Sequence, residues 1–436
     1  MKSSKQQVGL ITATSLVVGN MIGAAIYVLP ATLAGYGSIS ILAWVLTALG
    51  SLALAKIFGN FSRIIVQKSG GPYIYTKEGF GDFIAFLMAW GYWISIWVGN
   101  AAIAIGVVSA LSFFIPVLET NAVYSVLTGL GLIWFLTWMN SKGIKTSGRI
   151  QVVTTLFKIL PLLGFIILGA FYFDTSNFPE FNLTGESDLQ TVAVVATLTL
   201  YAFLGVECAT IPAENIKNPE KTVPRATMLG TVLTTLIYIS ATVVLFGLIP
   251  VESLRNSPAP FAEASHLIGG QYSGYIVAAG AAIAALGALN GWILISGQIP
   301  MAAARDRLFP KVFKKENSSQ TPALGIVIGS VLTSAVMLMN FSDSLVSQFK
   351  FMILLSTLTS LIPYLFTSAS YALVIIEQKI GVPKLIRNLV LAALGFSYSL
   401  WTIYGSGNDT VFYGFLLLLA GIPFYILMKY NQKKDR

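Results

Sequence analysis

Charged residues are scarce in this chain of 436 residues: 10% are Asp, Glu, Lys or Arg, whereas 55% are hydrophobic. A soluble domain is typically about 25% charged. This number of charged residues is too small to cover a water-exposed surface. Most of the chain must therefore lie in lipid. Because no alternating strand pattern is present, the sequence argues against a β-barrel and favours a bundle of membrane-spanning helices.

Cysteine and histidine are almost absent. Cys208 is the one cysteine, which excludes an internal disulfide framework. His266 is the one histidine, which argues against a metal site built from several histidines. The sequence also has no nucleophile–base constellation and no phosphate-cradling loop. We therefore predict no metal, no cofactor and no enzymatic activity.

Twelve apolar runs are present, each long enough for the roughly 20 residues of a membrane-spanning helix. They cover residues 10–34, 39–66, 84–114, 123–140, 150–173, 189–212, 225–250, 274–302, 322–340, 351–376, 387–405 and 411–429. The first run has no convincing cleavage site and leads into further spans, so we interpret it as an uncleaved helix. We predict an all-α integral membrane protein with a single transmembrane domain over residues 1–436.

Positive charge predicts the orientation. With twelve spans, the termini and every second loop lie on one side. All Lys and Arg residues except Arg255 and Lys350 fall on that side, with Lys158 counted in one of its loops. The positive-inside rule then places both termini in the cytoplasm. The net charge of +9 therefore reflects topology, and we expect membrane lipid rather than nucleic acid as a partner.

Two spans carry matching interruptions. In the first span, six residues separate Gly23 from Pro30. In the sixth span, six residues likewise separate Gly205 from Pro212. The two segments are five spans apart, so they cross the membrane in opposite directions. Such paired interruptions mark binding sites in transporters, because a helix broken in lipid exposes backbone groups that must line a polar cavity. The alternative is that these small residues only allow close helix packing.

Glu207 is the one acidic residue deep within a predicted span. A charged side chain at that depth is costly, so an acid there is a functional candidate. We expect it to act as a proton or cation partner. The alternative is a neutral, hydrogen-bonded structural residue.

Seven segments spread over nearly the whole chain resemble one known family. They read GNMIGAAIYVLPATLA (19–34), GGPYIYTKEGFG (70–81), YWISIWVGN (92–100), GVECATIPAENIKNPEKTVPRAT (205–227), GWILISGQIPMAAARDRLFPKVF (291–313), IPYLFT (362–367) and GSGNDTVFYGF (405–415). The chain is similar to the basic amino acid/polyamine antiporters of the amino acid–polyamine–organocation superfamily, and within them to the arginine/agmatine branch.

The resemblance implies a LeuT-like fold of two inverted five-helix repeats, over about 10–173 and 189–376, with extra helices over about 387–429. It implies a homodimer in the bacterial inner membrane. It also implies exchange of a cationic amino acid for its decarboxylated amine by alternating access, with L-arginine and agmatine as the leading pair. Another amino acid/diamine pair, or proton-coupled import of a basic amino acid or polyamine, remains open as an alternative.

The resemblance also assigns residues. Trp292 matches the aromatic on which the substrate cation stacks, which is worth about 0.5–2 kcal/mol. Ser95, Asn100 and Ser356 match positions that bind the distal cationic group, and Tyr201 matches an aromatic that closes over the substrate and is usually Trp. The remaining substrate-binding positions are Asn20, Met21, Gly23, Ala24, Ala25, Ile96 and Leu204. Tyr92, Glu207 and Tyr364 match a gating and pH-sensing layer, and Tyr73 or Tyr75 matches a further gate.

One position departs from the family. The break in the first span usually reads Gly-Ser-Gly, and here it reads Gly23-Ala24-Ala25. The hydroxyl that would bind an α-carboxylate is therefore missing, at a cost of about 1.5–3 kcal/mol for a hydrogen bond to a charged group. This favours a substrate without a carboxylate, such as agmatine or a diamine, over an amino acid.

Overall fold

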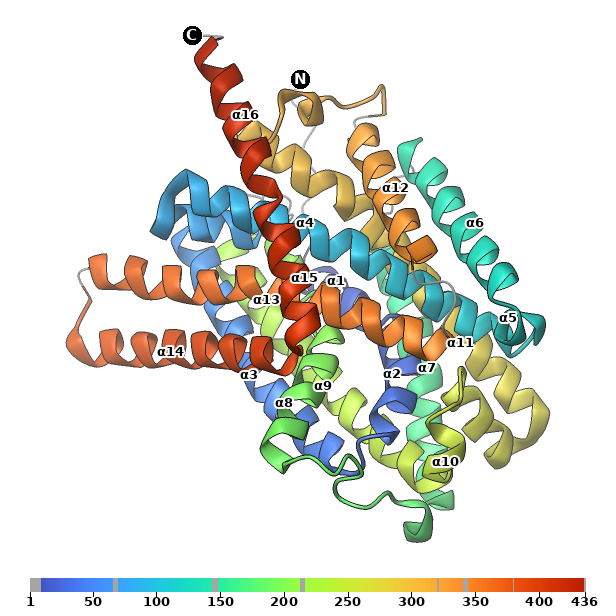
Figure 1. The fold of residues 1–436 in the computed structure, drawn as a ribbon. Helices are drawn as coiled ribbons and strands as arrows, with labels where there is room; N and C mark the ends of the chain where they lie inside the picture. The colour runs from blue at the N-terminus through green and yellow to red at the C-terminus, as the bar shows by residue number, and fades with distance from the viewer. Residues whose placement is uncertain are drawn as a thin grey trace.

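The computed structural model describes residues 9–65, 70–142, 148–211, 216–319, 321–339, 344–378 and 380–434, and for residues 148–154 and 434 it describes the backbone alone. These residues form a bundle of helices without strands (Figure 1). Several residues used in the predictions lie outside the described ranges: Lys2, Lys5, Lys68, Lys145, Pro212, Lys379 and Arg436.

Ten helices of the described chain are long and apolar enough to cross a membrane, and two shorter apolar helices, α8 and α12, occupy the predicted sixth and ninth spans. The helices are α1 (Leu10–Met21), α2 (Ala24–Ala34), α3 (Ile39–Ile64), α4 (Pro72–Ser112), α5 (Val117–Thr120), α6 (Ala122–Ser141), α7 (Gly148–Gly169), α8 (Asp188–Tyr201), α9 (Pro219–Leu248), α10 (Val251–Leu254), α11 (Pro260–Arg305), α12 (Ala323–Met339), α13 (Leu345–Glu377), α14 (Val382–Gly405), α15 (Asn408–Leu419) and α16 (Gly421–Lys434). Short 3₁₀ turns are η1 (Ala170–Tyr172), η2 (Thr175–Asn177), η3 (Cys208–Thr210) and η5 (Lys311–Lys314). The prediction of a multi-pass, all-α membrane protein is confirmed.

The outer surface of the bundle is apolar. Leu49 on α3, Leu127 on α6, Leu236 on α9 and Leu394 on α14 are each about 60% exposed, whereas the carboxyl side chain of Glu207 is fully buried. This pattern is the reverse of that of a soluble protein and suits a lipid environment, where the apolar face points outward.

Both predicted helix breaks are present. The first span is interrupted between α1 and α2 at Ile22 and Gly23, whose backbone angles are not helical. In the sixth span, α8 ends at Tyr201, the chain turns through Gly205 (φ 110°), and η3 follows. The two interrupted segments lie in the interior of the bundle, because Ile22, Phe203 and Glu207 are fully buried.

Three further features were not predicted. α4 begins at Pro72 rather than near residue 84, and α11 begins at Pro260 rather than near residue 274. Hydropathy alone could not find these starts, because polar residues such as Lys77 and Glu78 occupy the added turns. The last predicted span is also divided, at Ala420, into α15 and α16.

The added turns of α4 and α11 are built alike. Each helix starts with a proline in its first turn, and each is then kinked at a glycine, Gly81 (φ 73°, ψ −169°) and Gly270 (φ 71°, ψ −169°). Side-chain-bearing residues rarely adopt this backbone conformation, so glycine is required at both positions. The shared geometry supports the predicted division into two repeats, which stays a prediction.

Candidate functional site

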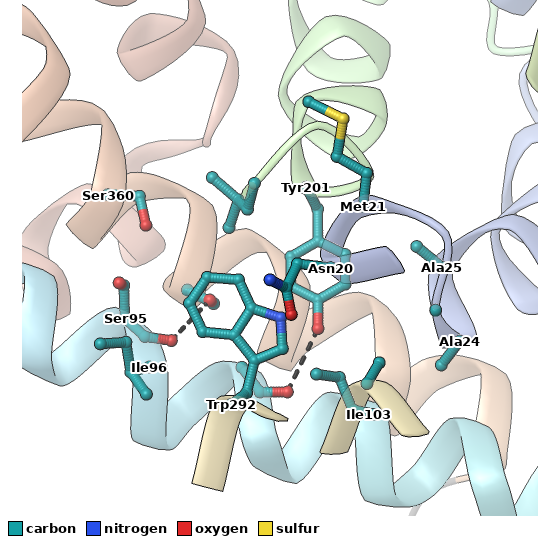
Figure 2. A pocket seen from close by; sticks show the side chains of 15 residues that line it. Asn20, Met21, Ala24, Ala25, Ser95, Ile96, Ile103, Tyr201, Trp292 and Ser360 are labelled. Carbon is teal, nitrogen blue, oxygen red and sulfur yellow. Dashed lines mark hydrogen bonds between the residues drawn. The ribbon is translucent and has the colours of Figure 1, made fainter. Parts of the chain in front are cut away.

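A buried cavity lies where the two broken spans face α4, α11 and α13 (Figure 2). Its volume is about 30 Å³, which holds water but not a whole amino acid, so the cavity is nearly closed in this arrangement of the helices. Its lining consists of Asn20, Met21, Gly23, Ala24, Ala25, Ser95, Ile96, Gly99, Ile103, Tyr201, Leu204, Ala288, Trp292, Ser356 and Ser360. None of these residues is acidic or basic.

The lining includes every residue predicted to bind substrate except Asn100. Asn100 is buried on α4 beside Gly99, and its side-chain oxygen has no hydrogen-bond partner among the described residues. Four lining residues were missed: Gly99, Ile103, Ala288 and Ser360. Helical spacing could have found them, because each lies three to seven residues from a predicted residue on the same face of its helix.

Three hydroxyl groups of the cavity are oriented as hydrogen-bond acceptors. Ser95 donates its hydroxyl hydrogen to the Tyr92 carbonyl (2.7 Å), Ser356 to the Ser95 carbonyl (2.8 Å), and Tyr201 to the Gly99 carbonyl (3.2 Å). Each hydroxyl has a single hydrogen, which is used by the backbone, so only oxygen lone pairs remain for a ligand. Such a lining suits a ligand that brings its own N–H donors.

Asn20 adds both an acceptor and a donor. Its side-chain amide gives one of its two hydrogens to the Leu16 carbonyl (2.9 Å), which leaves the amide oxygen as an acceptor and the second hydrogen as a donor. This oxygen lies close to Gly291, where an added Cβ would come within 3.2 Å of it. The neighbouring residue, Trp292, lies beside Asn20 in Figure 2.

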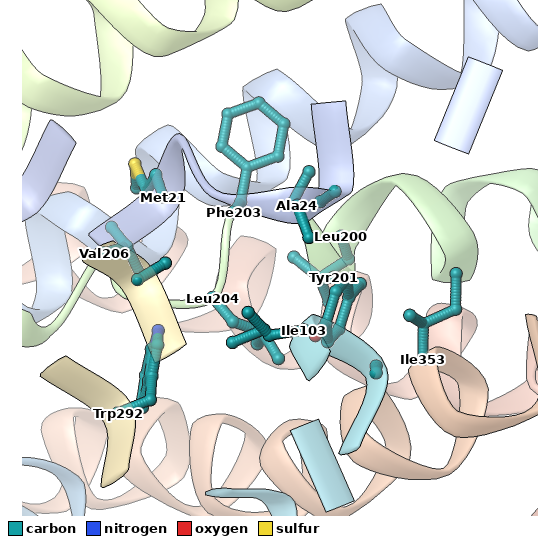
Figure 3. Close-up of a cluster of buried hydrophobic side chains, with 14 of the residues drawn as sticks. Met21, Ala24, Ile103, Leu200, Tyr201, Phe203, Leu204, Val206, Trp292 and Ile353 are labelled. Carbon is teal, nitrogen blue, oxygen red and sulfur yellow. The ribbon is translucent and has the colours of Figure 1, made fainter. Parts of the chain in front are cut away.

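Aromatic and aliphatic side chains form the rest of the wall (Figure 3). Trp292, 8% exposed, and Tyr201, 7% exposed, flank the aliphatic Leu204 and Ile103. The Tyr201 ring is held edge-on by Phe349 at 6.0 Å. A cation over an indole face is stabilised by the ring quadrupole, so Trp292 adds a second feature that suits a positively charged ligand.

The start of α2 borders the cavity without a capping side chain. Gly23 is the N-cap, and no side chain accepts from the first N–H groups of α2. These N–H groups and the positive end of the helix dipole face the break, as in anion-binding helix termini. Ala24 packs tightly on α4 at Gly106, where an added Cβ would lie 2.3 Å from that of Ala24.

Tyr238 of α9 joins the two breaks. Its hydroxyl lies 2.6 Å from the Met21 carbonyl at the end of α1 and 3.1 Å from the Ala202 carbonyl just after α8. The ring is fully buried between Trp44 and Phe203. The single hydroxyl hydrogen is shared between the two carbonyls, so Tyr238 ties the two interruptions together.

The predicted gating residues Tyr92, Glu207 and Tyr364 are in direct contact. The Glu207 carboxylate accepts hydrogen bonds from the hydroxyl groups of Tyr92 and Tyr364, the latter at 2.6 Å, and from the Gly205 N–H at 3.2 Å. Glu207 does not line the cavity. The layer links α4, α13 and the segment after α8.

Tyr73 and Tyr75 lie apart from that layer. The Tyr73 hydroxyl donates to Asp306 at 3.3 Å, just beyond the end of α11. The Tyr75 ring stacks on Phe61 of α3, with centroids 4.6 Å apart and an interplanar angle of 5°. Of the two, only Tyr73 makes a polar contact between α4 and the end of α11.

Lys158 corrects the charge assignment. It was counted as a loop residue, yet it lies within α7, is 1% exposed and donates to the Gly19 carbonyl at 2.8 Å. Gly287 of α11 leaves room for it, because a Cβ there would lie 3.2 Å from the lysine Cε. Hydropathy could not reveal the burial of Lys158, because a single lysine in an apolar run is readily assigned to the end of a span. A buried cation thus contacts the end of α1, where the helix dipole is negative.

Comparisons with known proteins agree with this geometry. The model of the amino acid permease family matches residues 8–427. The putrescine transporter PotE of Escherichia coli (strain K12) is 33% identical over 436 residues, covering 98% of this chain and 97% of that protein. The arginine/agmatine antiporter of Chlamydia pneumoniae is 33% identical over 449 residues, covering 98% and 90%. The cadaverine/lysine antiporter of Escherichia coli (strain K12) is 31% identical over 429 residues, covering 97% and 95%.

The match extends over nearly the whole chain and over the relatives' own lengths, so it includes both broken spans and every helix that lines the cavity. The predicted resemblance is confirmed, as is the prediction of a transporter rather than an enzyme. The chain belongs to the amino acid permease family of membrane transporters.

Proposed function

We propose that the protein exchanges a cationic amino acid for its decarboxylated amine, with L-arginine and agmatine as the leading pair. One observation carries the proposal: the cavity offers hydroxyl and amide oxygens from Ser95, Ser356, Tyr201 and Asn20, together with the Trp292 ring. This lining accepts hydrogen bonds from a guanidinium or ammonium group, and it does so without a buried acidic side chain. The relatives include an arginine/agmatine antiporter and a cadaverine/lysine antiporter, which supports the same class of substrate.

The break between α1 and α2 bears on the two partners of the exchange. An amino acid can place its carboxylate against the free N–H groups at the start of α2, but Ala24 offers no hydroxyl to assist. An amine without a carboxylate does not need that contact. We therefore expect the amine to compete with the amino acid more effectively here than at a site that has serine in place of Ala24. For the same reason, each transport assay should include putrescine or another diamine.

Alternating access would use the two broken spans as the moving part. Tyr238 ties the breaks to each other, so they are expected to move together. The layer of Tyr92, Glu207 and Tyr364 would form a gate between the cavity and one side of the membrane. The contact of Tyr73 with Asp306 would form a second gate. In this proposal Glu207 is a gate and pH sensor, not a substrate ligand.

The test is uptake of labelled arginine by purified protein in liposomes loaded with arginine, agmatine, lysine, ornithine, putrescine or buffer alone. Exchange predicts uptake only into vesicles that contain a substrate, and the fastest internal substrate identifies the pair. Equal uptake into buffer-loaded vesicles would contradict exchange.

Lys158 favours a second candidate, proton-coupled import of a basic amino acid or polyamine. A buried amine in contact with the end of α1 could carry a proton across while the broken span moves. Import predicts uptake into empty vesicles when the outside is acidic, and Lys158→Met should remove the dependence on the proton gradient. We also expect a homodimer in the bacterial inner membrane with both termini in the cytoplasm.

A further inference from the structure

A second, open pocket of about 420 Å³ lies between α3, α13 and α14 and shares no residue with the substrate cavity. α14 packs against both other helices (Figure 1). Four cationic side chains line the pocket, Lys56 and Arg63 from α3 and Lys384 and Arg387 from α14, and no acidic residue does. Among the described residues, none of these four cations has an ion-pair partner. The described protein therefore supplies no acidic partner for these charges, and the Arg63 guanidinium donates only to the Glu220 carbonyl, at 3.3 Å.

The floor of the pocket is polar and buried. The Asn60 amide donates to the Tyr371 hydroxyl at 2.7 Å, so the hydroxyl keeps its own hydrogen available to a ligand. Tyr371 is 1% exposed. Asn388 is 7% exposed, and its side-chain amide makes no hydrogen bond within the described part of the chain. The amide is therefore open to the pocket and can donate to a ligand there.

The pocket opens beside surfaces that face lipid. On α3, the exposed Leu42, Val45 and Leu49 continue in helical steps to Lys56, Asn60 and Arg63 on the same face. On α14, the exposed Ile386, Val390 and Leu394 border the pocket residues. Apolar tails can therefore lie along both helices while a polar head reaches the four cations.

We propose that this pocket binds the phosphate-bearing headgroup of an anionic phospholipid. Basic pockets between membrane helices on the cytoplasmic side recognise such headgroups through charge, and the positive-inside rule puts this pocket on that side. The tyrosine hydroxyl and the Asn388 amide would donate to phosphate or glycerol oxygens, and the four cations would surround the charge. The proposal does not depend on which substrate is carried.

The site would connect two parts of the protein. α3 packs against α8 and α9, which hold the break after Tyr201 and the bridging Tyr238, whereas α13 carries Ser356 and Tyr364. A headgroup held between α3, α13 and α14 therefore favours the arrangement described here over one in which these helices separate. Bound anionic lipid is expected to raise the melting temperature of the purified protein.

The test is native mass spectrometry of the full-length protein in detergent with phosphatidylglycerol or phosphatidylcholine. Wild-type protein should retain phosphatidylglycerol in preference to phosphatidylcholine. The double variant Lys384→Gln/Arg387→Gln should bind it about 30-fold more weakly, which corresponds to about 1 kcal/mol for each charge removed. Both side chains are exposed at the start of α14, so the fold should not depend on them.

The matched control is Lys217→Gln/Lys221→Gln, which removes the same charge from an exposed segment outside the pocket. The proposal would be overturned if both double variants lost phosphatidylglycerol binding equally, or if the wild type did not prefer phosphatidylglycerol to phosphatidylcholine. The four cations would then only set the orientation of the protein in the membrane. Asn388→Leu adds a test without a charge change: loss of preference supports a built site. Displacement of the lipid by millimolar inorganic phosphate would contradict a lipid site and indicate a soluble phosphate ligand.

Discussion

At the scale of single residues, the selectivity of the cavity for a cation follows from the acceptors to which its hydroxyl groups donate. Ser95, Ser356 and Tyr201 each donate to a backbone carbonyl, so these three side chains present oxygen lone pairs to a ligand. A carboxylate finds no partner among these side chains, whereas an ammonium or guanidinium finds several. The charge preference of the cavity is thus set without a buried acid, and a buried unpaired acid would be costly when the site is empty.

Trp292→Leu tests this interpretation. Losing the indole face should weaken binding of a cationic substrate about 2- to 30-fold, the range expected for a cation–π contact. The measurement is a binding titration with arginine and agmatine, accompanied by a melting curve to show that the variant is folded. Trp134→Leu on the outer face of α6, where the ring is 41% exposed, is the control and should bind like wild type. Unchanged binding by Trp292→Leu would remove this residue from the site.

Ala24→Ser tests the departure at the first break. A hydroxyl at the start of α2 should strengthen binding of arginine by about 1.5–3 kcal/mol, the value of a hydrogen bond to a charged group, and leave agmatine unchanged. The readout is the ratio of the two dissociation constants. Ala31→Ser, on the same helix but outside the cavity lining, should leave the ratio as it is. An equal gain for both ligands would show that no carboxylate binds there.

At the scale of elements, the two broken spans depend on each other through Tyr238. Tyr238→Phe removes the hydroxyl shared by the Met21 and Ala202 carbonyls. The Met21 carbonyl keeps the Gly23 N–H at 2.9 Å, whereas the Ala202 carbonyl loses its donor in a buried position. Leaving a buried group unsatisfied costs about 1–3 kcal/mol, so the melting temperature should fall and transport should slow. Tyr124→Phe, whose ring is 53% exposed, should change neither property. A wild-type melting temperature in Tyr238→Phe would show that the breaks do not need this link.

The kinks of α4 and α11 allow a paired comparison. Gly81 and Gly270 have the same backbone angles, and an added Cβ at either would meet no atom within 4 Å. Gly81→Ala and Gly270→Ala should therefore cost about the same, of order 1 kcal/mol, from backbone strain alone. Gly131→Ala, in regular α6 and equally free of neighbours, should be neutral or stabilising. Thermal unfolding of the three variants checks this, and a large difference between the two kink variants would count against equivalent repeats.

At the scale of the whole molecule, the sequence predicted what depends on local pattern. Hydropathy located the spans, and the Gly–Pro spacing located both breaks, since glycine and proline act on the backbone at their own positions. Lys158 was misplaced because its burial depends on Gly19 and Gly287, which are distant in sequence. Likewise, the Tyr238 bridge and the orientation of the Ser356 hydroxyl depend on carbonyl groups of other helices. Such contacts are set by packing, which a single sequence does not display.

The measurement that tests the central claim most directly is arginine uptake into agmatine-loaded and buffer-loaded liposomes, compared for wild type, Trp292→Leu and Trp134→Leu. We predict uptake that requires internal agmatine, is retained by Trp134→Leu and, at an arginine concentration well below saturation, is about 2- to 30-fold lower in Trp292→Leu. Uptake into buffer-loaded vesicles that matches uptake into agmatine-loaded ones, or wild-type exchange by Trp292→Leu at that concentration, would contradict it.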